Sequence, residues 1–131
     1  MKKGIILLFM TFLLCACPED TVELAGTTWT IISIEDQKTN ADDWRVAFDE
    51  ENRFSAFLGC NNMFGSVSLK AERIKIGPVM STKMACRDMN FEDRFVQLAE
   101  GIDGYKTEND LLYLYIADKK VMTLQQSKRN D

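Results

Sequence analysis

The chain of 131 residues contains no histidine. A Ser-His-Asp or Cys-His catalytic arrangement is therefore excluded, and so is zinc bound through histidine. The four cysteines do not form a CxxC pair, and two that remain after the N-terminal region cannot build a four-thiolate zinc site. A glycine-rich phosphate-binding motif and an EF-hand calcium loop are also missing. The sequence thus predicts no metal ligands, no catalytic residues and no cofactor.

Long hydrophobic runs are missing too. The longest, from Gly4 to Leu14, has about eleven residues, whereas a spanning helix needs about twenty. Because a short basic start precedes this run and small residues follow it, residues 1–16 read as a secretory signal peptide. The stretch 14–17 resembles the bacterial lipobox, in which cleavage precedes the final cysteine. We expect cleavage after Ala16, a diacylglycerol on Cys17 and a tether over residues 17–23. An ordinary signal peptide followed by an unrelated cysteine is the alternative.

Basic residues are outnumbered by acidic ones. Lys and Arg together number 16 against 20 Asp and Glu, and removal of residues 1–16 takes two lysines and changes the formal charge from −4 to −6. Nucleic acids and anionic lipid surfaces are bound by clustered cations, so neither is an expected partner. We expect attachment to the membrane through the lipid on Cys17 alone, and a location in the bacterial cell envelope.

Cys60 and Cys86 remain once the signal peptide is removed and Cys17 is lipidated. In an oxidising compartment we expect them to form a disulfide. This bond would close a loop of 25 intervening residues and contribute roughly 3–4 kcal/mol of stability. Two buried free thiols are the main alternative.

Short runs of alternating apolar and polar residues dominate the mature chain. In the first of them, Trp29 and Ile31 share one face, while Thr28, Thr30, Ile32 and Ile34 share the other. Glycine- and asparagine-rich turns separate the runs. The expected strands are 26–34, 44–48, 53–58, 66–69, 73–76, 105–108, 111–116 and 121–125. Residues 79–86 form either an additional edge strand or an extended connection.

One helix is expected, beginning after Asn90 as N-cap. Two acids, Glu92 and Asp93, fall in its first turn, where the helix dipole favours negative charge. An apolar stripe at helical spacing predicts its buried face, and Gly101 and Gly104 predict its end. The stripe consists of Phe91, Phe95, Leu98 and Ile102.

These elements predict a mainly β (α+β) fold. We expect a small antiparallel β-barrel-like domain of about eight short strands with one helix, over residues 24–126, followed by a polar tail at 127–131. About 115 mature residues can bury a real core, so the disulfide would reinforce the fold rather than create it.

Several motifs in a fixed order resemble the META/HslJ domain family. In chain order they are Gly26-Thr27-Thr28-Trp29, Leu58-Gly59-Cys60-Asn61 with Gly65, Ile76-Gly77-Pro78, Ser81-Thr82-Lys83-Met84-Ala85-Cys86, a helix with Glu92, Phe95 and Leu98, and Leu111-Leu112-Tyr113-Leu114. The resemblance implies a small antiparallel β-barrel-like fold and an envelope or secreted location. Members of the family are associated with heat-inducible expression, novobiocin tolerance and parasite virulence. The resemblance implies no catalytic residues.

The candidate recognition loop is Asn61, Asn62, Met63 and Phe64, because functional groups often lie on loops held by a rigid scaffold. The alternative is that Asn61 and Asn62 serve only the turn geometry beside the disulfide.

Two functions remain. The first is a membrane-tethered, monomeric, non-enzymatic module that binds an envelope protein or a small apolar ligand and supports stress resistance. The second is a hydrolase that acts on envelope material through two carboxylates, which requires two close acids in a cleft and a raised pKa on one of them. The adjacent acid pairs are Asp42-Asp43, Glu50-Glu51 and Glu92-Asp93.

Overall fold

The computed structural model describes residues 23–40 and 42–127. The expected signal peptide, the lipidation site at Cys17, most of the tether and residues 128–131 of the tail lie outside these ranges. Among the described residues, no helix is both long and apolar enough to cross a membrane.

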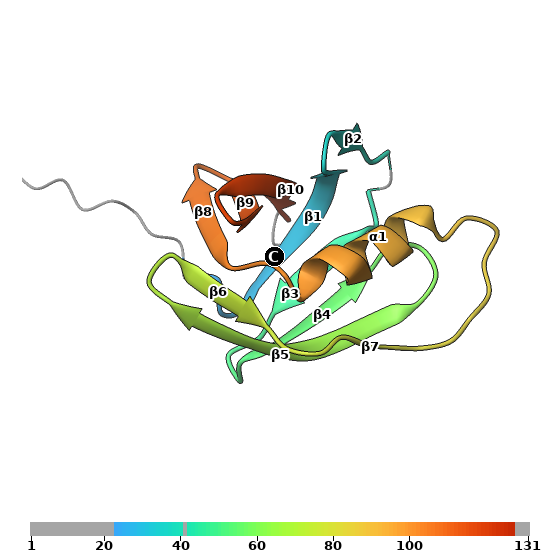
Figure 1. Ribbon diagram of the computed structural model, residues 1–131, viewed down its shortest axis with the longest axis horizontal. Helices are drawn as coiled ribbons and strands as arrows, with labels where there is room; N and C mark the ends of the chain where they lie inside the picture. Colours follow the sequence, from blue (N-terminus) through green and yellow to red (C-terminus); the bar gives the residue numbers. More distant parts are fainter. Residues whose placement is uncertain (1–22, 41, 128–131) are drawn as a thin grey trace, which may run out of the picture.

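The described residues form ten strands and one helix (Figure 1). The helix is α1 (Asn90–Ala99), which precedes the last three strands. The strands are β1 (Thr27–Ile34), β2 (Gln37–Lys38), β3 (Arg45–Phe48), β4 (Arg53–Phe57), β5 (Asn62–Lys70), β6 (Arg73–Ile76), β7 (Met80–Ser81), β8 (Gly104–Glu108), β9 (Leu111–Ile116) and β10 (Lys119–Gln126).

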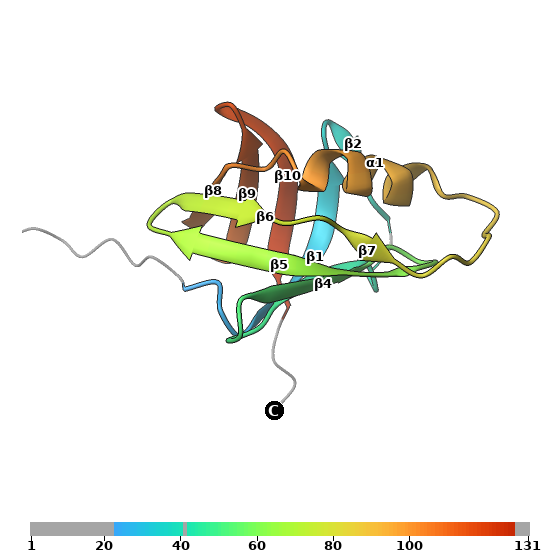
Figure 2. The same ribbon diagram turned by 60° about the horizontal axis from the view of Figure 1, so that its bottom comes forward.

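The strands form one antiparallel sheet that closes on itself. Its order is β10-β9-β8-β6-β5-β4-β3-β1-β2, and β10 also pairs with β1. The closing pairs make a ring of eight strands, while β2 and β7 are two-residue additions (Figures 1 and 2). The ring confirms the expected mainly β, antiparallel fold with one helix. Its weakest link joins β6 to β8 through a single residue pair, Arg73 with Gly104.

Alternation of side chains along the strands puts the core inside the ring. In β4 the buried residues Phe54 and Ala56 alternate with the exposed Arg53 and Ser55. Trp29 is fully buried, as expected for a core residue. Helix α1 packs near β1 and adds an apolar face to this core. The buried apolar residues of its predicted stripe are Phe95, Leu98 and Ile102.

One expected face in β1 is wrong. Alternation predicts Ile34 on the face of Thr28 and Thr30, opposite Trp29, but Ile34 is buried together with Trp29 and Ile31. The pairing with β10 explains the change, because Ile31 and Ser33 face the consecutive residues Leu124 and Thr123. Ile32 is therefore the extra residue of a β-bulge, and the alternation shifts by one after it.

The start of the helix also differs from expectation. Asn90 is the first helical residue, and the N-cap position belongs to Met89, which makes no capping hydrogen bond through its side chain. Instead, the carboxylate of Asp88 accepts a hydrogen bond of 3.1 Å from the backbone N–H of Asn90. At the other end the helix stops at Ala99, and Gly101 lies just beyond its C-cap, as expected. Gly104, also expected to end the helix, belongs to β8 instead.

Candidate functional site

Cys60 and Cys86 are bonded to each other, as expected. The disulfide joins Cys60, which follows β4, to Cys86, which precedes α1, and the two Cα atoms are 6.1 Å apart. Cys60 is buried and Cys86 is exposed. The bond therefore attaches the exposed connection between β7 and α1 to the body of the domain.

Asn61 is the centre of a buried hydrogen-bond network. Its side chain is 2% exposed. Its amide nitrogen donates to Glu92 Oε1 at 2.6 Å and to the carbonyl of Met84 at 3.1 Å. Its amide oxygen accepts hydrogen bonds from the backbone N–H of Met84 at 2.7 Å and from the hydroxyl of Thr82 at 2.9 Å. One side chain thus holds α1 and the connection after β7 against the end of β4.

Glu92 completes this network from the helix. Its carboxylate is 4% exposed and accepts both the side-chain bond from Asn61 and a 2.9 Å bond from the backbone N–H of the same residue. Glu92 lies in the first turn of the helix as expected, but its carboxylate turns inward toward Asn61. Asp93 beside it is exposed.

The four residues expected to form a recognition loop do not do so. Asn62, Met63 and Phe64 belong to β5, where successive side chains point to opposite sides. Met63 is fully buried, as is Asn61 before the strand, and only Asn62 and Phe64 face outward. The alternative, a structural role for Asn61 beside the disulfide, describes this residue better than a role in recognition. Its burial is explained by its side-chain hydrogen bonds rather than by a turn conformation of its backbone.

Steric constraints explain why glycine occupies positions 59 and 65 of the Leu58–Gly65 motif. Gly59 has a φ of +95°, and a Cβ atom there would lie 2.9 Å from Nε1 of Trp44. Gly65 pairs with Phe54 across β4 and β5, and its Cβ would lie 2.4 Å from that ring. The motif that carries the family resemblance is therefore chiefly a structural device.

A groove on the outside of the sheet is the best candidate for a binding site. It has a volume of about 550 Å³ and lies over β3, β4, β5 and β7. Phe64 and Met80 form its exposed apolar wall, with 44% and 65% of their surfaces open to solvent. A second hollow of about 390 Å³ shares Ala47, Ser55 and Phe64 with it. We call the two hollows together the outer-face groove.

Strand register explains the shape of the outer-face groove. Ala47 pairs with Ser55, Ser55 with Phe64, and Phe64 with Met80, so these four side chains lie in one row across the strands. The two small residues make the floor and the two large ones make the wall. The nearest outward positions in the neighbouring rows include Phe57, which adds another apolar side chain at one end.

The groove has a charged border at the β3–β4 turn. Arg53 lies 2.8 Å from Asp49 and 2.7 Å from Glu51. The hydrogen bond that Arg53 donates from its side chain, followed by backbone hydrogen bonds, lowers the pKa of Asp49. One guanidinium faces two carboxylates, so this border keeps a net negative charge beside the apolar wall of the groove.

The acids with shifted pKa values are ionised more readily than usual. Besides Asp49, the pKa of Glu35 is lowered, chiefly by hydrogen bonds from the guanidinium of Arg94 at 2.6 and 2.7 Å. A carboxylate that acts as a general acid needs the opposite shift. Among the described residues, no group of three or more Cys, Asp or Glu side chains is placed to hold a metal ion. Neither Glu35 nor Asp49 therefore has the raised pKa that the carboxylate-hydrolase hypothesis requires.

Comparisons with known proteins agree with this architecture. The family model described as META domain matches residues 22–129. No curated protein matches the sequence. An NMR structure of a protein from Burkholderia xenovorans is 21% identical, with a TM-score of 0.68 over 81% of this chain and 85% of that one. The crystal structure of a DUF4847 family protein from Bacteroides vulgatus is 12% identical, with a TM-score of 0.60 over 82% of this chain and 96% of that one. At these identities the two structures show a common fold alone.

Proposed function

Since this chain belongs to the META domain family, whose model matches residues 22–129, we propose that it is a lipid-anchored envelope protein whose domain binds a protein partner without catalysis. The observation that carries the proposal is the outer-face groove, where Phe64 and Met80 are exposed on the outward face of the strands. The partner is a protein with an apolar segment that lies along the row of outward side chains.

The shape of the groove favours a protein segment over a small ligand. A small-molecule site normally encloses most of the ligand. Here the floor is a sheet face that is open to solvent on one side, so a small ligand would remain largely hydrated. A protein segment covers such a face together with its surroundings, and its apolar side chains fill the space beside Phe64 over the small residues Ala47 and Ser55.

The free energy gained by covering Phe64 and Met80 suits a partner that is held in the same membrane. Complete burial of a Phe or Met side chain contributes about 1.5–3 kcal/mol, so covering the exposed portions of Phe64 and Met80 contributes roughly 2–3 kcal/mol in total. That is too little for tight binding from solution. A membrane anchor raises the effective concentration of the partner when the partner lies in the same membrane.

The proposed anchor lies close to the domain in sequence. Leu24 is fully buried and is seven residues after Cys17. Seven extended residues span at most about 25 Å, so a lipid on Cys17 keeps the domain within that distance of the bilayer surface. The proposed lipid supplies the attachment, because the formal charge of −6 on the mature chain opposes adsorption to anionic lipid.

The test combines site-directed photo-crosslinking with loss of the anchor. A photoreactive phenylalanine analogue replaces Phe64 in one strain and the exposed Lys106 of β8, on another part of the ring, in a control strain. Irradiation of living cells should join a discrete envelope protein to position 64 and not to position 106. The adduct should fall when Met80→Glu is added, and also when Cys17→Ala releases the protein from the membrane.

Two results would contradict the proposal. Equal adducts at positions 64 and 106 would mean that the crosslinks report proximity at the membrane rather than a docking face. A Cys17→Ala protein that stays in the membrane fraction would remove the anchor from the proposal, whatever happens at Phe64.

A further inference from the structure

The methionines of the described residues fall into two groups by exposure. Met80 and Met84 are 65% and 61% exposed, whereas Met63 and Met122 are 0% and 1% exposed. Met89 is half-buried. The buried pair fills the core, a common role of this adaptable side chain. The exposed pair adds little to the core, and its thioether sulfur atoms are open to reagents in the solvent.

Strand register places Met80 in the outer-face groove. It pairs with Phe64 across β7 and β5, while the next residue, Ser81, pairs with the buried Met63. The side chain of Met80 therefore shares the outward side with Phe64 and forms the sulfur-containing part of the groove wall. A chemical change of this sulfur atom alters the surface on which the proposed protein partner docks.

Met84 has nearly the same exposure in a different place. It belongs to the connection between β7 and α1 and borders a hollow of about 540 Å³ beside the helix. The residues that line the outer-face groove do not include it. Its hydrogen bonds to Asn61 use backbone atoms alone, so a change of its side chain leaves them in place. Met84 is thus a matched control for Met80 within the same chain.

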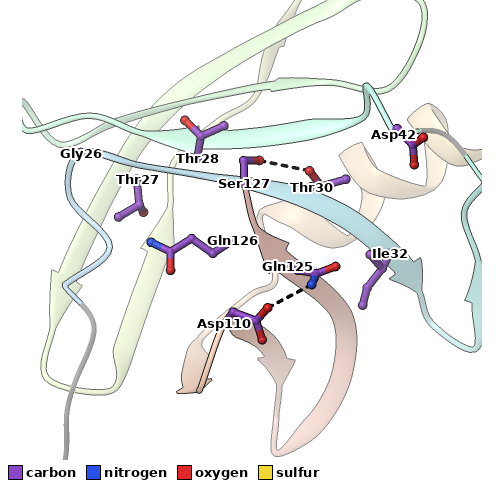
Figure 3. Close-up of a pocket in the computed structure, with 10 residues that line it drawn as sticks. All are labelled: Gly26, Thr27, Thr28, Thr30, Ile32, Asp42, Asp110, Gln125, Gln126 and Ser127. Carbon is purple, nitrogen blue, oxygen red and sulfur yellow. Dashed lines mark hydrogen bonds between the residues drawn. The ribbon is translucent and has the colours of Figure 1, made fainter. Parts of the chain in front are cut away.

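The hollow where β1 meets β10 has a different chemistry. It has a volume of about 890 Å³ and is lined mainly by hydroxyl, amide and carboxylate side chains (Figure 3). Among the described residues that border it, none carries a sulfur atom. Oxidation of methionine therefore changes the outer-face groove and leaves this hollow unchanged.

Oxidation of a thioether is a two-electron transfer of one oxygen atom. With hydrogen peroxide, the sulfur lone pair attacks one peroxide oxygen, an S–O bond forms, the O–O bond breaks, and the second oxygen leaves as water after a proton transfer. The sulfur is oxidised to the sulfoxide and the peroxide is reduced. The product is polar where the thioether was apolar, and sulfoxide reductases reverse the change.

We propose that Met80 is a reversible oxidation site that controls docking: the thioether form binds the protein partner and the sulfoxide form releases it. The control of docking rests on the proposed function, whereas the oxidation of Met80 does not. Met84 should oxidise at a similar rate without an effect on docking. At the proposed envelope location the domain meets oxidants that arrive from outside the cell, so docking would respond to oxidative stress.

Peptide mass spectrometry tests the oxidation site. The full mature chain, kept in detergent micelles, is treated with hydrogen peroxide, then reduced and digested with trypsin. Of the seven methionines, two lie in the expected signal peptide, and cleavage after Lys and Arg puts each of the others on its own peptide. Met80 and Met84 should oxidise at least about tenfold faster than Met63 and Met122. Reductases specific for the two sulfoxide epimers should restore both exposed residues.

Photo-crosslinking from position 64 tests the consequence. Met80→Gln imitates the polar sulfoxide, and Met80→Leu keeps an apolar side chain without sulfur. The adduct should fall at least about fivefold in Met80→Gln and persist in Met80→Leu. Met84→Gln should leave it unchanged. When isolated membranes are treated with hydrogen peroxide before irradiation, the adduct should fall with Met80 present and persist in Met80→Leu.

The outcomes distinguish this inference from the proposed function. An absent adduct in untreated cells would overturn the proposed function together with the control of docking, while the oxidation rates would still decide whether Met80 is an oxidation site. With an adduct present, the inference alone is overturned by any of three results: Met80 oxidises no faster than Met63, Met80→Gln keeps the full adduct, or peroxide removes the adduct equally from Met80→Leu.

Discussion

Replacement of Asn61 by Ala should destabilise the domain far more than replacement of its neighbour Asn62. The Asn61 side chain makes four hydrogen bonds of 2.6–3.1 Å to Glu92, Met84 and Thr82. Alanine removes all four and leaves one oxygen of the buried Glu92 carboxylate without a donor. Asn62 is exposed, and its neighbours reach it through backbone atoms that Ala retains.

The expected size of the effect follows from burial. Loss of a hydrogen bond to a buried charged group costs about 1.5–3 kcal/mol. The other three bonds involve Thr82 and Met84, which are exposed, so water replaces part of their contribution and the loss is roughly 1 kcal/mol in total. We expect Asn61→Ala to lower the free energy of unfolding by about 3–4 kcal/mol, and Asn62→Ala by less than about 0.5 kcal/mol.

The assay is equilibrium unfolding in urea, followed by fluorescence of Trp29 and Trp44 with the disulfide intact. The double variant Asn61→Ala with Glu92→Met should lose less than the sum of the two single variants, because it removes the stranded carboxylate. The buried network would be refuted as a source of stability if Asn61→Ala lowered the free energy of unfolding no more than Asn62→Ala does. It would also be refuted if the losses of the two single variants simply added in the double variant.

A second set of expectations concerns the disulfide, one ion pair and one glycine. Reduction of the wild type, or Cys86→Ser, should lower the free energy of unfolding by about 3 kcal/mol, and non-reducing mass spectrometry of a digest should join the peptides of Cys60 and Cys86; equal stability with and without reductant would contradict this. Because folding lowers the pKa of Glu35, its ion pair with Arg94 stabilises the domain at pH values above the unfolded pKa of Glu35. This stabilisation is lost as the pH falls through the lower pKa of the folded state. Arg94→Gln should therefore raise the pKa of Glu35, as measured by NMR titration, and no rise would exclude the guanidinium as its cause. Gly59→Ala should cost about 1–3 kcal/mol in urea unfolding, because its positive φ and the nearby indole both oppose a Cβ atom, and an unchanged midpoint would contradict that strain.

The local periodicity of apolar residues was sufficient to predict most of the strands and the helix. Alternation predicted Arg53–Phe57 and Arg73–Ile76 almost to the residue, since one buried face forces a period of two. The 91–102 stripe predicted the buried face of α1 for the same kind of reason. The assignment failed at 59–65, where glycine and asparagine suggested a turn but β5 begins at Asn62. Pairing with β4 on one side and β7 on the other supplies backbone partners that outweigh the local preference.

The candidate site was harder to predict, because it depends on register. Phe64 was singled out together with Asn61 as one loop, yet the first faces solvent and the second is buried. The row that joins Ala47, Ser55, Phe64 and Met80 exists only because four strands align in one particular register. Nothing local to any of these residues indicates the other three.

The sequence by itself determined the class of this protein: composition excluded histidine chemistry, periodicity predicted an antiparallel domain with one helix, and ordered motifs pointed to its family. Tertiary structure alone decided what the motif residues do. Asn61 and Glu92 are 31 positions apart, and the pairing of β1 with β10 joins the first and last strands of the domain. Contacts between distant segments depend on how the ring closes, and the closure is a property of all strand pairs together rather than of any segment.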